Sequence, residues 1–248
     1  MRELLLNILN LIDLTTLEGT DNKSRINDLC EQAISFKKDN LAYPAAVCVY
    51  PLFVRQAKKI LRNTPIRVAC VAGGFPSGQM PLNLRLKEVR YAIKKGADEV
   101  DMVISRGKFL EGDFNFIRKE ISKTKRICRD KHLKVILETG ELKTAENIRL
   151  ASTIAIESGA DFIKTSTGKI SPAATLEAAE IMLDVIKKHY DETGVMIGFK
   201  PAGGISEVED AIAYYNLVDK ILGKAWLNNR YFRFGASRLA GKISEKLL

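Results

Sequence analysis

The chain has 248 residues, of which 46% are hydrophobic and 28% charged, and its formal net charge is +9. This profile is typical of a soluble globular protein rather than a disordered or membrane one. No apolar run approaches the ~20 residues that span a bilayer. No low-complexity linker interrupts the chain, so we expect one domain over residues 1–248, located in the cytoplasm and without a membrane partner.

The first predicted element is an amphipathic helix at the N-terminus, MRELLLNILNLIDL, in which polar residues recur and no cleavage site follows. Short apolar, β-branched runs predict strands in the rest of the chain. These runs lie at 45–50, 66–72, 98–104, 134–139, 160–165, 194–200 and 219–223, with a weaker one at 11–15.

Longer segments with helical periodicity separate these runs, for example residues 86–97, 144–160 and 173–190. Alternating strands and helices imply parallel strands with helices packed outside them. Eight such units in about 250 residues predict a TIM (β/α)8 barrel with an additional N-terminal helix. A doubly wound open sheet is the alternative, but it usually has a Gly-rich loop after the first strand, and LIDLTTLEGT contains none.

In a barrel of parallel strands, a polar residue within an apolar run should point into the lumen, because the outward residues must meet helices. The outward set is expected to include Val100, Met102, Val135, Leu137, Ile163, Val195, Ile197 and Phe199. The inward set is expected to include Glu99, Asp101, Ile136, Glu138, Phe162, Lys164, Met196, Gly198 and Lys200. We therefore expect Lys164, Lys200, Asp101 and Glu138 to converge near the C-terminal mouth, where barrel enzymes carry their chemistry.

Cysteine and histidine restrict the chemistry. Cys30, Cys48, Cys70 and Cys128 have unrelated spacings and are expected to be buried thiols of a reducing compartment. The two histidines, His132 and His189, stand in charged stretches where we expect surface positions. A histidine-based triad or a histidine-ligated zinc site is therefore not expected.

The net positive charge raises nucleic acid as a possible partner. The lysine pairs at 37–38, 58–59, 94–95 and 187–188, however, fall on separate predicted helices and are interleaved with acids. No aromatic residues alternate with these cations, as single-strand binding would require. We expect solvated helix faces and no nucleic-acid partner, although a positive surface would attract a small anion.

Two lysines in one enclosed site predict amine chemistry. Each ammonium raises the cost of charging the other, and burial adds to that cost. A lysine that is neutral near pH 7 attacks a carbonyl to form a Schiff base, which permits cleavage of a neighbouring C–C bond. Asp101 is a candidate for proton transfer. The alternative is that Lys164 and Lys200 only pair with Asp101 and Glu138 in buried salt bridges.

Three glycine-containing segments predict a phosphate site at the same rim. STGK follows the sixth predicted strand, AGGIS the seventh and GAS the eighth. Barrels commonly bind phosphate with the loops after strands 7 and 8 and a helix N-terminus. Gly203 and Gly204 are the main candidates, supported by Gly168, Gly235, Ala236 and Ser237.

These segments resemble the signature blocks of the deoxyribose-phosphate aldolase family. The resemblance rests on LIDLTTL, AAVCVYP, GADEVDMVI, VILETGEL, GADFIKTSTGK, GFKPAGGI and YFRFGAS, in family order. It implies a class I aldolase that reversibly cleaves 2-deoxy-D-ribose 5-phosphate to D-glyceraldehyde 3-phosphate and acetaldehyde, without cofactor or metal and as a homodimer.

The resemblance also implies roles for individual residues. Lys164 would form the Schiff base, Lys200 would lower its pKa, and Asp101 would take part in proton relay. The remaining matches imply a substrate-binding and phosphate-binding set: Asp13, Thr15, Thr167, Gly168, Lys169, Gly203, Gly204, Gly235 and Ser237.

The chain departs from the family pattern at the phosphate segments. Ser206 stands where some relatives carry Arg, and Arg238 where some carry a second Ser, so Arg238 is a candidate replacement cation. Some members end in a tail with a Tyr that assists proton transfer, whereas the last Tyr here is Tyr231. Two alternatives stay open: a Schiff-base aldolase for a larger sugar, and a barrel that binds phosphosugars or nucleic acid without catalysis.

Overall fold

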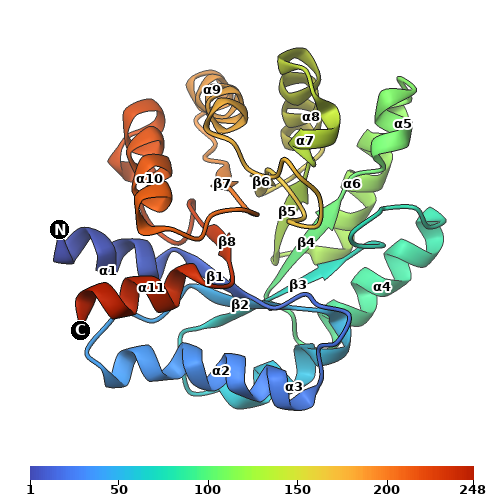
Figure 1. Ribbon diagram of the computed structural model, residues 1–248. Helices are drawn as coiled ribbons and strands as arrows, with labels where there is room; N and C mark the ends of the chain where they lie inside the picture. Colours follow the sequence, from blue (N-terminus) through green and yellow to red (C-terminus); the bar gives the residue numbers. More distant parts are fainter.

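The structure is a computed structural model that describes residues 1–248. Eight parallel strands form its centre, and helices surround them (Figure 1). The strands are β1 (Ile12–Thr15), β2 (Ala46–Val49), β3 (Arg67–Ala72), β4 (Glu99–Val103), β5 (His132–Ile136), β6 (Phe162–Lys164), β7 (Gly198–Lys200) and β8 (Phe234–Ala236). The architecture is the predicted TIM barrel.

Helices follow or precede each strand around the barrel. The α-helices are α1 (Arg2–Asn10), α2 (Lys23–Lys38), α3 (Val54–Leu61), α4 (Leu82–Lys94), α5 (Arg106–Leu110), α6 (Phe114–Cys128), α7 (Thr139–Leu142), α8 (Ala145–Glu157), α9 (Leu176–Thr193), α10 (Val208–Leu222) and α11 (Leu239–Leu247). Two 3-10 helices, η1 (Pro51–Phe53) and η2 (Lys224–Trp226), complete the set. The additional N-terminal helix is present as α1, which lies beside α11 (Figure 1).

The sheet runs in the order β7-β6-β5-β4-β3-β2-β1-β8. Between β7 and β8 the barrel closes through two isolated parallel bridges, Phe199 with Phe232 and Ala202 with Gly235. Three backbone hydrogen bonds cross this seam: Phe199 N–H to Tyr231 O, Arg233 N–H to Phe199 O, and Gly235 N–H to Pro201 O. The seam therefore holds the two strands together over a short stretch only.

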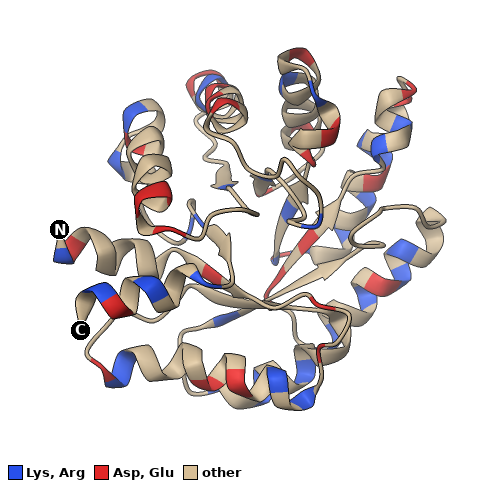
Figure 2. Cartoon of the chain, in the orientation of Figure 1, with Lys and Arg blue, Asp and Glu red and all other residues tan.

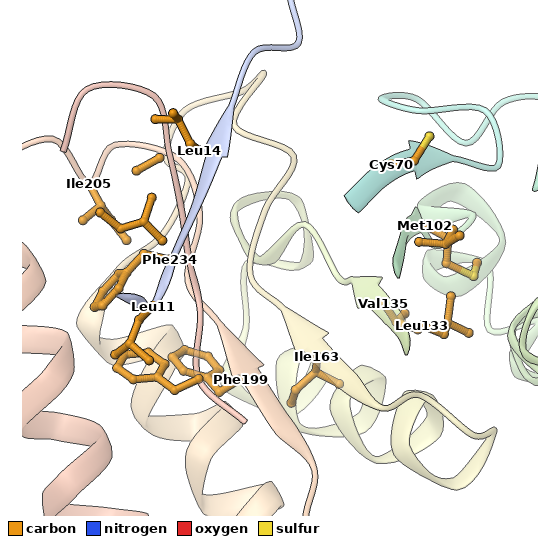
Figure 3. Close-up of a cluster of buried hydrophobic side chains, with 14 of the residues drawn as sticks. Leu11, Leu14, Cys70, Met102, Leu133, Val135, Ile163, Phe199, Ile205 and Phe234 are labelled. Atoms are coloured by element: carbon orange, nitrogen blue, oxygen red, sulfur yellow. The ribbon is translucent and has the colours of Figure 1, made fainter. Parts of the chain in front are cut away.

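The outward faces of the strands carry the main hydrophobic core. Met102, Val135, Ile163 and Phe199 belong to one large cluster of buried residues that packs the strands against the helices. Figure 3 shows these side chains together with others of the same cluster. Burying apolar surface in this way contributes about 25 cal/mol per Å² removed from water. The outward half of the predicted alternation is confirmed at these positions.

One predicted strand was wrong. Residues 219–222 form the last turn of α10, Gly223 follows that helix, and the eighth strand is β8 at Phe234–Ala236. The apolar positions Val208, Ala211, Val218 and Leu222 recur at helical spacing and are buried, so α10 continues to Leu222 and ends at Gly223, whose φ is +82°. Gly235 and Ala236, predicted to follow the eighth strand, therefore lie within it.

Smaller corrections concern strand ends. The strand predicted at 194–200 begins only at Gly198, because Gly194 caps α9 in the left-handed conformation with φ +71°. The strand predicted at 134–139 begins at His132, which is partly buried rather than solvent-facing, and ends at Ile136.

The lumen has two unlike halves. On β2 and β3 the inward residues are small and apolar: Ala46, Cys48, Ala69 and Val71 form a separate buried cluster with Leu17. On the other side the inward residues of β4 to β7 and of β1 are mostly charged and fully buried. Phe162 also points inward, and a Cβ added at Gly198 would lie 2.4 Å from its ring. Only glycine at this position leaves room for that ring.

The remaining charges lie mainly on the surrounding helices. Figure 2 shows Lys and Arg interspersed with Asp and Glu on these helices, as expected from the sequence. All four cysteines are buried and unpaired, which confirms the prediction of buried thiols. None of the helices combines the length and the hydropathy that crossing a bilayer would require.

Candidate active site

Two lysines and one aspartate meet inside the barrel. Lys164 is the last residue of β6 and Lys200 the last residue of β7, and the two pair in register. Asp101 lies on β4 and points inward from the other side of the lumen. Its Oδ2 accepts hydrogen bonds from Lys164 Nζ at 2.9 Å and from Lys200 Nζ at 2.8 Å. The predicted convergence of these three side chains is confirmed.

The environment of Lys164 disfavours its charged form. The side chain is 3% exposed. Burial lowers the pKa of Lys164 below its ordinary value, and the nearby cation of Lys200 lowers it further, although Asp101 acts in the opposite direction. Lys164 is therefore the amine in this cluster that most readily loses its proton.

Lys200 behaves differently although it is equally enclosed. Burial alone would lower its pKa, but the carboxylates of Asp101 and Asp13 outweigh burial and raise it. Its Nζ donates to Asp13 Oδ2 as well as to Asp101. Lys200 therefore remains a cation beside Lys164, and the pKa values of the two amines shift in opposite directions.

Asp101 is an ionised carboxylate. Burial by itself would raise the pKa of Asp101, but Lys134, Lys164 and Lys200 together hold it well below its usual range. Its Oδ1 accepts from Lys134 Nζ at 2.9 Å, which leaves Oδ2 for the other two amines. Lys134 thus fixes the rotamer in which Asp101 bridges Lys164 and Lys200.

A network of ion pairs forms the floor below this cluster. Lys134 Nζ contacts Glu99 Oε2 at 2.5 Å, and Arg233 donates to Glu99 Oε1 at 2.7 Å and to Asp13 Oδ1 at 2.6 Å. All four residues are buried. We call Asp13, Glu99, Lys134 and Arg233 the floor network. Asp13, predicted to line the substrate pocket, lies within this network and not at the pocket surface.

Sequence reasoning missed two members of the floor network. Lys134 stands two residues before the inward-facing Ile136, so the same alternation would have placed it in the lumen. Arg233 gave no such signal, because the eighth strand was expected at residues 219–223 instead of Phe234–Ala236.

Glu138 does not join the lysines, so the prediction that it converges with them was wrong. The strand ends at Ile136, and Glu138 adopts the left-handed conformation with φ +60°. Its carboxylate instead accepts from Arg106 Nη1 at 3.0 Å and from the backbone N–H and hydroxyl of Thr167. The break in alternation after Ile136 turns the side chain away from the lysine cluster.

A pocket opens above Lys164 at the C-terminal ends of the strands. Most of the predicted binding residues line it, and these are Thr15, Thr167, Gly168, Lys169, Gly203, Gly204, Gly235 and Ser237. Ser206 and Arg238 line it as well. Lys164 is the one member of the lysine and aspartate cluster that reaches the pocket surface. A molecule in this pocket therefore meets Lys164 first.

Backbone donors on the pocket wall are unpaired. The N–H groups of Gly168, Gly203, Gly204 and Ser237 make no hydrogen bond within the chain. Successive free N–H groups in tight turns form concave sites that favour anions. Gly203 has φ +85°, and a Cβ there would lie 2.6 Å from Ala173 Cβ. Glycine is required at this position for the two loops to approach each other.

Three basic side chains face the pocket, and their partners differ. Lys164 contacts Asp101, and Lys169 forms an ion pair of 3.0 Å across the mouth with Glu18, which lies 151 residues earlier in the chain. Arg238 is exposed and forms no ion pair, and it directly precedes α11. Arg238 is thus the pocket cation with its charge free for a ligand.

The comparisons with known proteins agree with this geometry. The sequence profile of the DeoC/LacD family aldolases matches residues 7–226. The human protein named deoxyribose-phosphate aldolase is 44% identical over 255 residues, which cover 98% of this chain and 80% of the human protein. A mouse protein of the same name is 42% identical, with the same coverage.

Among solved structures, the tetrameric deoxyribose phosphate aldolase of Aeropyrum pernix superimposes with a TM-score of 0.76 at 22% identity. The match covers 98% of this chain and 91% of that chain, and at this identity it supports the fold alone. The family profile and the two mammalian relatives, together with a buried pair of lysines at the mouth of a barrel, place this chain in the DeoC/LacD family of aldolases.

Proposed function

We propose that this enzyme is a class I aldolase that reversibly cleaves 2-deoxy-D-ribose 5-phosphate to D-glyceraldehyde 3-phosphate and acetaldehyde. The observation that carries the proposal is the position of Lys164. Its amine is buried at the base of the pocket, its pKa is lowered, and Lys200 lies beside it on the same aspartate oxygen. The mammalian relatives named for this activity support the choice of substrate.

The reaction begins when the neutral Lys164 amine attacks the C1 aldehyde of the open-chain sugar. Loss of water gives an iminium ion, which withdraws electrons from the adjacent carbon. Removal of the proton from the C3 hydroxyl then breaks the C2–C3 bond, and the electron pair moves into the iminium to form an enamine. Glyceraldehyde 3-phosphate leaves, the enamine is protonated at C2, and hydrolysis releases acetaldehyde and the free amine.

The neighbours of Lys164 have distinct roles in this scheme. Lys200 keeps the pKa of Lys164 low, because its charge opposes a second cation in the same cavity. Asp101 accepts from both amines and carries protons between Lys164, Lys200 and the reacting atoms, with bound water completing the path. Asp101 is within hydrogen-bond distance of both amine nitrogens before any substrate arrives.

The phosphate of the substrate would bind at the other end of the pocket. The free N–H groups of Gly168, Gly203, Gly204 and Ser237 supply the donors. Thr15, Thr167, Lys169 and Gly235 line the same cavity, and Asp13 acts from below through Lys200. Arg238 adds a cation at this end and takes the place of the arginine that some relatives carry at position 206.

Covalent trapping tests the mechanism. The protein is treated with acetaldehyde and borohydride, which reduces a Schiff base to a stable amine, and the adduct is mapped by mass spectrometry. We expect modification at Lys164, with the more exposed Lys169 as the internal control. Absence of an adduct at Lys164, or equal labelling of both lysines, would overturn the mechanism.

A second measurement tests the substrate. Turnover is compared on 2-deoxy-D-ribose 5-phosphate and on fructose phosphates. Preference for the deoxyribose compound is expected, whereas faster cleavage of a fructose phosphate would favour an aldolase for larger sugars. Trapping without turnover on either compound would require another substrate.

We also propose that residues 1–248 work as one catalytic domain, in the cytoplasm and as a homodimer. Four buried, unpaired thiols support a reducing compartment. The homodimer follows from the family resemblance, and light scattering of the purified protein tests it. A mass of four chains would instead match the tetramer named for the Aeropyrum pernix relative.

A further inference from the structure

Glu138 is a buried carboxylate that the proposed mechanism does not use. Its exposed fraction is 0%, and it stands directly between β5 and α7. Its φ of +60° is in the left-handed region, which residues other than glycine adopt at a cost. Such conformations persist where surrounding contacts hold them, and they concentrate at functional sites.

Both oxygens of this carboxylate are engaged by the loop that follows β6. Oε1 accepts the backbone N–H of Thr167 at 3.1 Å, and Oε2 accepts its hydroxyl at 2.5 Å. The Thr167 hydroxyl oxygen in turn accepts the N–H of Lys169 at 3.1 Å. The backbone N–H groups of Thr167 and Lys169 therefore have hydrogen-bond partners within the chain, whereas the N–H of Gly168 stays free at the pocket wall.

Arg106 holds the carboxylate from the opposite side. Its Nη1 lies 3.0 Å from Glu138 Oε2, and its Nη2 donates to the carbonyl oxygens of Pro76 and Ser77. Charge-assisted bonds of this kind are shorter and stronger than neutral ones. Arg106 thus ties Glu138 to the loop after β3, a part of the barrel remote from the phosphate end of the pocket.

Close packing restricts the same loop further along the chain. A Cβ added at Gly140, in α7, would lie 2.1 Å from the carbonyl oxygen of Pro172. A Cβ added at Gly203 would lie 2.9 Å from Gly168 Cα. The segment from Thr167 to Pro172 therefore packs closely against the loop after β7 at Gly168 and against the α7 turn at Pro172, and Glu138 bonds to its first residue.

We infer that Glu138, held by Arg106, is a positioning residue for recognition of the substrate's phosphate. It sets the path of residues 167–169 so that the free N–H of Gly168 and the side chain of Lys169 face the same subsite as Gly203. Glu138 contacts neither the Schiff-base lysine nor the substrate and acts through Thr167. This inference rests on the proposed function, because it assigns the pocket to a phosphorylated sugar.

Glu138→Gln tests the inference while keeping the size of the side chain. The amide turns one acceptor into a donor, which then opposes a donor of Thr167 or Arg106. We expect KM for 2-deoxy-D-ribose 5-phosphate to rise about tenfold while kcat changes less than about threefold, since misplaced binding groups weaken affinity without touching the nucleophile. The kcat/KM for unphosphorylated 2-deoxy-D-ribose should stay at the wild-type value.

The chain offers a matched control in a second buried Arg–Glu pair. Arg85 Nη1 lies 2.6 Å from Glu120 Oε2, and neither residue lines the pocket. Glu120→Gln should lower stability without changing the ratio of kcat/KM for the phosphorylated and unphosphorylated sugars. If Glu138→Gln leaves this ratio unchanged, or if both variants lower it equally, the positioning role is refuted.

If Glu138→Gln does not accumulate as folded protein, Arg106→Lys tests the same inference. It preserves the charge but loses the fork that reaches both Glu138 and the carbonyl oxygens. We expect a smaller change of the ratio in the same direction, and an unchanged ratio again refutes the inference. A wild-type enzyme that does not cleave the phosphorylated sugar would instead count against the proposed function.

Discussion

The pKa of a buried lysine is raised in the floor network and lowered at the mouth of the barrel. Lys134, in the floor network, lies within 3.5 Å of three carboxylates, Glu99, Asp101 and Asp13, and its pKa is raised although burial alone would lower it. Lys164, at the mouth, contacts Asp101 alone, and its pKa is lowered. Burial is common to both, so the number of neighbouring carboxylates decides which amine stays charged.

The buried charges of the lumen explain why the pKa of Lys164 is lowered. Three carboxylates, Asp13, Glu99 and Asp101, face three permanent cations, Lys134, Lys200 and Arg233. These charges cancel without any contribution from Lys164. A proton on Lys164 would therefore add an unbalanced positive charge in a cavity that water does not screen well.

The largest effect is expected for the reactive amine itself. Lys164→Arg keeps a long basic side chain at the mouth but cannot form a Schiff base, so kcat should fall by about 10⁴-fold or more. The measurement is steady-state cleavage of 2-deoxy-D-ribose 5-phosphate, with circular dichroism to check the fold. Substantial residual turnover would mean that the mouth does not hold the nucleophile.

The second largest effect is expected when Lys200, the cation beside Lys164, is removed. Without the charge of Lys200, Asp101 acts on Lys164 with less opposition, and the pKa of Lys164 should rise. A rise of about two units lowers the neutral fraction about 100-fold near pH 7. Lys200→Leu should therefore lose about 100-fold in kcat at pH 7 and recover as the pH increases. A pH–rate profile that keeps its wild-type position contradicts this role of Lys200.

A change in the floor network should act mainly on stability. Arg233→Met leaves Asp13 and Glu99 each without one buried partner, and breaking such pairs costs about 3–5 kcal/mol. Urea unfolding at pH 7 measures this loss. At a temperature where the variant is folded, kcat should stay within about tenfold of the wild type, because Arg233 does not contact Lys164. If kcat falls by clearly more than tenfold, the floor network and the mouth of the barrel act together in catalysis.

The smallest effect is expected at the rim of the mouth. Arg238 is exposed, so its attraction for a phosphate is screened by solvent. Arg238→Ser should raise KM for the phosphorylated sugar about threefold, with kcat unchanged, and the difference should shrink in high salt. An equal rise of KM for unphosphorylated deoxyribose would mean that Arg238 does not act on the phosphate.

The part of this site that follows strand alternation could be predicted from the sequence. Period-two alternation along β4, β6 and β7 predicted that Asp101, Lys164 and Lys200 point into the lumen. Successive side chains on a strand point to opposite faces, so a residue next to an apolar residue that faces the helices must face the lumen. The helices around them were also predictable, since each carries an apolar stripe of helical period. The directions of these side chains are therefore properties of local sequence.

The parts that depend on contacts between distant segments could not be predicted. Glu138 continues the alternation of β5 by count, yet Thr167 and Arg106 draw its carboxylate away from the lysines. Strand β8, Phe234–Ala236, contains no β-branched residue, while the last turn of α10 ends in Ile-Leu and is followed by Gly, like a short buried strand. Arg233 was missed for the same reason. Tertiary hydrogen bonds, and not local propensity, fix these positions.

The seam between β7 and β8 lies beside the proposed phosphate subsite. Gly203 follows β7 and Ser237 follows β8, so an anion that accepts from both N–H groups would join the two strands where the barrel itself provides only isolated bridges. A bound anion would then hold β7 and β8 together and stabilise the closed barrel. Amide hydrogen exchange at Phe232 to Gly235 should slow when inorganic phosphate is added, because local opening of this join would first have to release the ligand.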